Sequence, residues 1–64
     1  MDKRTAQRLA KRIERDDAKC HVAGLRWETG VGYSVTIVDA RSGYIVVVRS
    51  VEDWERRQRE AQNA

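Results

Sequence analysis

The stretch YSVTIVDARSGYIVVVR, residues 33–49, decides the fold of this 64-residue chain. In its first half, apolar and aromatic residues alternate with Ser34 and Thr36, which is the period of a strand with one buried face. Asp39 and Gly43 then favour a turn, because an aspartate accepts a hydrogen bond from the backbone two residues ahead and a glycine adopts left-handed backbone angles without strain. The stretch therefore predicts a hairpin with strands at about 33–39 and 44–49 and a loop at 40–43.

The length of the loop decides which residues of the hairpin share a face. With four loop residues, Ile37 pairs with Val46 and Val35 pairs with Val48 on the core side, whereas a three-residue loop would shift this register by one. The continuous apolar run in the second strand is typical of a strand that is buried on both faces or that pairs with another chain. The outer face of the hairpin is more apolar than a solvated sheet, so we predict an interface there. Its residues are Thr36, Val38, Ile45 and Val47.

Length and composition limit what this chain can be. The chain has room for one domain, 1–64, and folding removes only about 60% of the unfolded surface from water, so a partner subunit would supplement the small core. Cys20 is the single cysteine and cannot form an internal disulfide. Together with the lack of a secretory apolar segment in the sequence, the single cysteine predicts a cytoplasmic protein. No apolar run approaches the ~18 residues of a membrane span, so no membrane contact is expected.

The net charge of +3 is concentrated at the start of the chain, where residues 1–19 hold seven basic and four acidic side chains. From Asp2, a suitable N-cap, to about residue 17, the spacing of the apolar residues is helical. Its apolar stripe consists of Ala6, Leu9, Ala10 and Ile13. At about 100° per residue, four cations fall on the opposite side of this helix, and we call them the basic ridge. The basic ridge is Arg4, Arg8, Lys11 and Arg15.

Both ends of this first helix carry charges that oppose the helix dipole. Arg4 lies near the positive end, and Asp16 and Asp17 lie near the negative end. Like charges along the ridge also repel one another by a few tenths of a kcal/mol per pair. Residues that work against local stability often mark functional positions, although a run of charges is more often a solvated face.

Residues 20–28 alternate as a first strand, and we expect its side with His21, Ala23, Leu25 and Trp27 to face the core. Tyr33 is assigned to the same core. The glycine-containing segment that follows, ETGVG at 28–32, is a turn and too short for a phosphate-binding loop.

A second helix is predicted at about 51–62, because Ser50 followed by Asp53 has the spacing of a capping box. Trp54 is its main apolar anchor. Acid and base side chains four residues apart are expected to neutralise this helix internally. The three pairs are Glu52–Arg56, Asp53–Arg57 and Glu55–Arg59.

Together these elements predict an α+β domain of order α-β-β-β-α, with a three-stranded antiparallel meander and both helices on one face. This topology resembles that of double-stranded RNA-binding domains and of small toxins with the same element order. Such RNA-binding domains carry a Gly-Pro-x-His loop between the first two strands and a lysine cluster at the start of the last helix. In this chain the loop is ETGVG and the last helix opens with Glu52 and Asp53, so the resemblance is one of topology alone.

Few residues of this chain are candidates for catalysis or metal binding. Cys20 and His21 are adjacent, but successive strand residues point to opposite faces and cannot form a nucleophile and base pair. One cysteine and one histidine are also too few ligands for a zinc site within one chain. A general base at His21 has no second catalytic group at a recognisable spacing. We therefore expect no enzyme activity, no metal, no cofactor and no small-molecule substrate.

Two binding hypotheses follow from the sequence. In the first, the basic ridge contacts the phosphates of DNA or RNA. In the second, the chain is a homodimer or binds another protein through the outer face of the sheet and the edge of the third strand, without a nucleic-acid role. The two are compatible, because a dimer would present the ridge twice.

Overall fold

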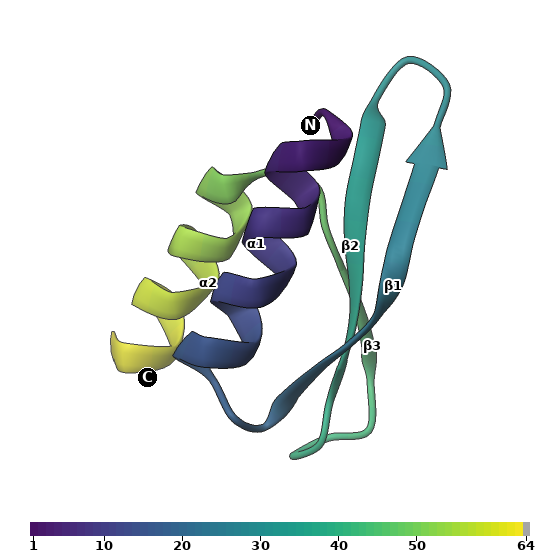
Figure 1. Ribbon diagram of the computed structural model, residues 1–64. Helices are drawn as coiled ribbons and strands as arrows, with labels where there is room; N and C mark the ends of the chain where they lie inside the picture. Colours follow the sequence, from purple (N-terminus) through teal and green to yellow (C-terminus); the bar gives the residue numbers. More distant parts are fainter. Residues whose placement is uncertain (64) are drawn as a thin grey trace.

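The computed structural model describes residues 1–63 and shows the predicted order α-β-β-β-α. The elements are α1 (Lys3–Asp16), β1 (Cys20–Glu28), β2 (Gly32–Asp39), β3 (Ile45–Val48) and α2 (Val51–Asn63). The strands form an antiparallel sheet in the order β1-β2-β3, and both helices lie on one face of it (Figure 1). The fold class is confirmed, and no predicted element end differs from the observed one by more than one residue.

The turn between β2 and β3 forms as its residues predict. The carboxylate of Asp39 accepts a hydrogen bond from the Arg41 N–H at 2.9 Å, and the Asp39 carbonyl accepts one from the Gly43 N–H at 2.7 Å. Gly43 has a φ of +76°, which a glycine adopts at little cost. This four-residue loop sets the predicted register, in which Ile37 pairs with Val46 and Val35 pairs with Val48.

Side-chain caps mark the starts of both helices. The Asp2 carboxylate accepts a hydrogen bond from the Thr5 N–H at 2.7 Å, and the Ser50 hydroxyl accepts one from the Asp53 N–H at 3.0 Å. The Asp53 carboxylate returns to the N–H of Arg49 rather than that of Ser50, so the second cap is a variant of the capping box. Each cap of this kind contributes on the order of 1 kcal/mol.

The core lies between the helices and the inner face of the sheet. All three fully buried residues of α1 come from its predicted stripe, and Trp54 of α2 is 1% exposed. Each element contributes at least one buried residue, so the sheet and both helices depend on one cluster. The cluster is Ala6, Leu9, Ile13, Cys20, Val35, Ile37, Val48 and Trp54.

A β-bulge in β1 overturns the predicted face assignment of this strand. Val22 pairs with Ile37 and Gly24 pairs with Thr36, so Ala23 is an extra residue that reverses the alternation. As a result Cys20 and Val22, rather than His21 and Ala23, share the core side with Leu25 of the same strand. The sequence does carry a signal for this, because a glycine inside a strand pattern often marks a bulge.

The prediction that Trp27 is a core residue is also wrong. Trp27 pairs with Tyr33 on the inner side of the sheet, but its side chain is 60% exposed while Tyr33 is half-buried. The end of the β1–β2 hairpin extends beyond the start of α1 (Figure 1), and Trp27 is the second-last residue of β1 before that end. The two rings pack edge to face with centroids 5.0 Å apart.

Candidate functional site

The basic ridge lies on the solvent side of α1. Its four side chains are all exposed, whereas the stripe half a turn away packs against the sheet. The structure therefore brings Arg4, Arg8, Lys11 and Arg15 together along one line, as the helical spacing predicts. From Arg4 to Arg15 the line is about 16 Å long, at about 1.5 Å per residue.

Most of the ridge is free of intramolecular partners. Within residues 1–63, Arg4, Arg8 and Lys11 form no ion pair and no side-chain hydrogen bond. Arg15 has one long contact, of 3.7 Å, to the carboxylate of Asp16, and its side chain remains 77% exposed. The charge of the ridge is thus directed mainly to solvent.

Arg12 is a cation of the same helix with a different role. Its guanidinium lies 3.2 Å from Glu55 of α2 and 3.2 Å from Asp16. The hydrogen bonds that the guanidinium donates to Glu55, and then to Asp16, raise the pKa of Arg12. Arg12 therefore links the two helices and does not belong to the ridge.

The acidic end of α1, which opposes the helix dipole, is explained by contacts with other elements. The Trp54 indole N–H donates a hydrogen bond of 3.1 Å to Asp16, and this bond is the main reason that the pKa of Asp16 is lowered. Asp16 therefore anchors α2 through the buried side chain of Trp54. The acidic side chain at the end of α1 thus has a structural role. The cation near the start of α1, Arg4, has no such role among the described residues.

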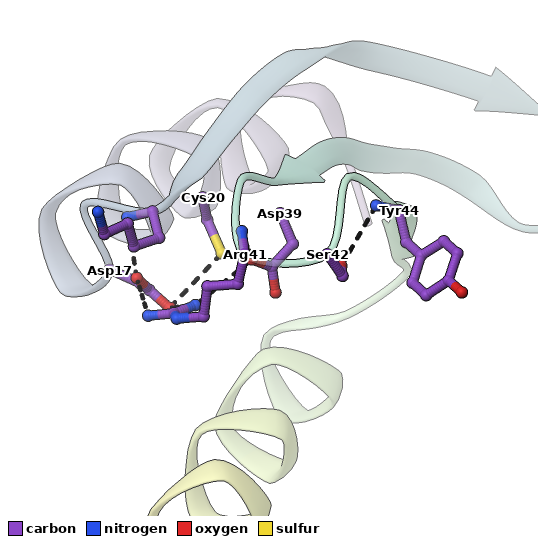
Figure 2. A network of polar contacts seen from close by, with 7 residues as sticks. Asp17, Cys20, Asp39, Arg41, Ser42 and Tyr44 are labelled. Atoms are coloured by element: carbon purple, nitrogen blue, oxygen red, sulfur yellow. Dashed lines mark hydrogen bonds and ion pairs between the residues drawn. The ribbon is translucent and has the colours of Figure 1, made fainter.

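Asp17 connects the end of α1 to the β2–β3 turn (Figure 2). Arg41 donates two hydrogen bonds to its carboxylate, at 2.8 and 3.0 Å, and these are the main cause of a lowered pKa of Asp17. The Cys20 thiol also donates to Asp17 at 3.6 Å, and burial raises the pKa of Cys20. Sequence patterns did not predict this network, because Asp17 and Arg41 are far apart in the chain.

The predicted internal neutralisation of α2 differs from what the structure shows. Asp53 lies 3.8 Å from Arg56 rather than beside Arg57, and Glu55 pairs with Arg12 of α1. None of the three predicted pairs four residues apart is formed within residues 1–63. A contact with another element is available to Glu55, and it replaces the local partner.

The four residues of the predicted interface lie together on the outer face of the sheet. Thr36 pairs with Val47 and Val38 pairs with Ile45, and neither helix covers this face (Figure 1). Ile45 is 69% exposed and the other three are half-buried. The structure thus confirms that they share a face, while a partner for that face stays a prediction.

The two edges of the sheet are protected to different degrees. The edge of β1 contains the bulge, and its Val22 N–H donates a hydrogen bond to the Glu14 carboxylate at 3.3 Å. The edge of β3 consists of four aliphatic residues, Ile45–Val48, without a charge or a bulge. Charges and bulges are what natural proteins use to prevent strand pairing, so β3 is the less protected edge.

The residues considered for catalysis are separated as expected. Cys20 is buried on the core side, whereas His21 is exposed and pairs with Val38 on the outer face. Among residues 1–63, no cluster of three or more histidine, cysteine, aspartate or glutamate side chains could hold a metal ion. In the same part of the chain, neither helix has the length and hydropathy to span a bilayer.

Comparisons of the chain with models of protein families, with curated proteins and with solved structures found no match.

Proposed function

We propose that this chain is a small cytoplasmic binding module that contacts the phosphates of a nucleic acid through the basic ridge. The observation that carries the proposal is that Arg4, Arg8 and Lys11, exposed on the solvent side of α1, have no ion pair with any side chain that the structure describes. A row of like charges destabilises its own helix slightly, and a polyanion would remove that repulsion.

The dimensions of the ridge suit a nucleic-acid backbone. Its length of about 16 Å corresponds to roughly five base-pair steps of a duplex. Its side chains project from a helix whose opposite side is buried in the core. Contacts of this kind position a protein on phosphates without reading sequence. The proposal is therefore for binding with little sequence preference.

The test is the salt dependence of binding to short DNA and RNA duplexes and single strands. If all four ridge cations contact phosphates, the logarithm of the association constant falls with the logarithm of salt concentration with a slope of about −3.6 on a duplex. We expect Arg8→Glu combined with Lys11→Glu to weaken binding and to reduce the magnitude of this slope, because both contacts become repulsive.

A matched control separates a local effect from one of net charge. Arg57→Glu combined with Arg59→Glu makes the same charge change on α2, where both side chains are exposed. We expect this control to bind more tightly than the ridge variant, with a slope closer to that of the wild type. Absence of binding to any of these ligands at low salt, or equal losses in the two double variants, would overturn the proposal.

A second candidate is a homodimer formed through β3. The observation that favours it is the unprotected aliphatic edge of β3 beside the uncovered outer face with Ile45. A small chain of this length also gains most from a partner that supplements its core. Light scattering at high micromolar concentration measures this directly, and a monomeric mass would exclude it.

A further inference from the structure

The exposed end of the β1–β2 hairpin presents an aromatic surface that the basic ridge does not include. Trp27 is 60% exposed, and an edge-to-face contact with Tyr33 occupies at most one face of its ring. Tryptophan is highly buried on average, so an indole that is exposed to this degree is unusual. The other tryptophan of the chain, Trp54, is 1% exposed.

The backbone of the first residues places this aromatic surface beside the start of the ridge. The Met1 carbonyl accepts a hydrogen bond from the Tyr33 N–H at 2.8 Å, so the start of α1 is fixed to β2 next to the hairpin end. Arg4 follows in the first turn of α1. Lys3 adds exposed positive charge at this end, where the exposed carboxylates are Asp2, which caps α1, and Glu28. Arg26 is also exposed, but it pairs with Ser34 on the other face of the sheet from Trp27.

We infer that Trp27 stacks on an unpaired base of the strand whose phosphates the basic ridge binds, so that the preferred ligand is a single-stranded or looped nucleic acid. This inference builds on the proposed function. Every nucleobase has an apolar face that stacks on an aromatic ring, and such contacts are tolerant of sequence, as is the ridge. A base inside a uniform duplex is already stacked on its neighbours and does not offer that face.

Three ligands distinguish stacking from phosphate binding: a short single strand, the same strand with abasic sites, and a blunt-ended duplex without a loop. The abasic strand keeps its phosphates but loses the stacking surface. We expect Trp27→Ala to weaken binding to the intact single strand about tenfold and to leave the abasic strand, the duplex and the salt slope unchanged. Trp27→Phe keeps an aromatic face and is expected to restore most of the affinity.

Tyr44→Ala is the matched control, because Tyr44 is 74% exposed but lies at the β2–β3 turn, and its ring points away from the network there (Figure 2). We expect it to bind all three ligands like the wild type. Fluorescence gives an independent readout: with Trp54 buried, quenching of the exposed Trp27 is expected with the intact strand and not with the abasic one.

The outcomes separate this inference from the function on which it builds. Salt-dependent binding that is lost in the ridge variant but not in Trp27→Ala, without quenching, would overturn the stacking role and keep the ridge. A loss in Trp27→Ala that is equally large on the abasic strand would overturn it too. Binding that depends on Trp27 but not on the ridge would overturn the proposed function, and no binding by the wild type would overturn both.

Discussion

At the scale of single residues, the close approach of Met1 to Gly32 leaves no room for a side chain at Gly32. Gly32 has a φ of +93°, and a Cβ atom added there would lie 2.6 Å from the Met1 carbonyl oxygen. That oxygen is the acceptor that holds the Tyr33 N–H. We expect Gly32→Ala to lower the free energy of unfolding by more than the roughly 1–2 kcal/mol that left-handed backbone angles alone cost a non-glycine residue.

Two other glycines provide graded controls for this substitution. A Cβ atom at Gly43, with φ +76°, or at Gly24 would meet no atom within 4 Å. Gly43→Ala therefore measures the cost of the backbone angle alone, and Gly24→Ala is expected to be neutral or slightly stabilising. Denaturant unfolding of the three variants checks this order, and the chemical shift of the Tyr33 amide reports release of Met1. Equal losses for Gly32→Ala and Gly43→Ala would show that the contact with Met1 is unimportant.

At the scale of elements, the backbone direction of β3 decides how its edge can be tested. The Asp39 N–H bonds to the Tyr44 carbonyl at 3.0 Å, and antiparallel pairing alternates from there. The backbone groups of Val46 and Val48 consequently point to β2, and those of Ile45 and Val47 point to the open edge. A proline is tolerated where the N–H it removes is not used by the sheet.

If β3 pairs with a second copy, Val47→Pro is expected to abolish the dimer while the monomer stays folded. Val46→Pro is the control for this substitution. It removes a hydrogen bond between β3 and β2 and is expected to unfold the domain, which shows that proline is tolerated in β3 only where the N–H points to the open edge. Mass by light scattering and circular dichroism at the same concentrations measure both effects. A Val47→Pro variant that keeps a wild-type dimer would place the interface elsewhere.

Features of the structure that are set by residues close together in the sequence could be predicted, whereas features set by contacts between distant segments could not. The β2–β3 register follows from Asp39 and Gly43, which act within their own turn, and the ridge follows from helical spacing. The bulge at Ala23 has a local signal in Gly24, which the alternation of apolar residues outweighed in the prediction. The exposure of Trp27 depends on how far the helices extend over the sheet, which no local pattern states. Glu55 pairs with Arg12 of α1, although its predicted partner Arg59 lies closer in sequence, because a contact between the two helices cannot be seen in the spacing within one of them.

At the scale of the whole molecule, a few carboxylates join elements that the small core alone joins weakly. A domain of this length has a free energy of unfolding of roughly 3–10 kcal/mol, so single contacts between elements matter. Asp16 holds α2 through Trp54, and Asp17 holds the β2–β3 turn through Arg41. Both carboxylates have pKa values lowered from the ordinary 3.8, which makes these contacts sensitive to acid.

The sign of this dependence follows from proton binding. As the pH falls below about 3.8, the unfolded chain takes up protons on Asp16 and Asp17 before the folded chain does, so the stability that they contribute is present above this pH and lost below it. At the other extreme, burial raises the pKa of Cys20 above its ordinary 9.0, so stability is expected to fall as the pH rises past that value. The stability profile is therefore a plateau between two falling limbs.

Substitutions test which residue causes the loss of stability at acid pH and which causes the loss at alkaline pH. Asp17→Asn is expected to lower the denaturant midpoint at pH 7, because the ion pair with Arg41 is lost, and to approach the wild type as the pH falls below 3.8, where the wild type loses the same charge. Cys20→Ala is expected to flatten the alkaline limb and to change the acid limb less than Asp17→Asn does, because the thiol is a minor cause of the lowered pKa of Asp17. Glu60→Gln changes an exposed carboxylate without an ion pair in residues 1–63 and is expected to leave the profile unchanged. A midpoint difference between Asp17→Asn and the wild type that is constant from pH 7 to pH 2 would show that the charge of Asp17 does not hold the turn to α1.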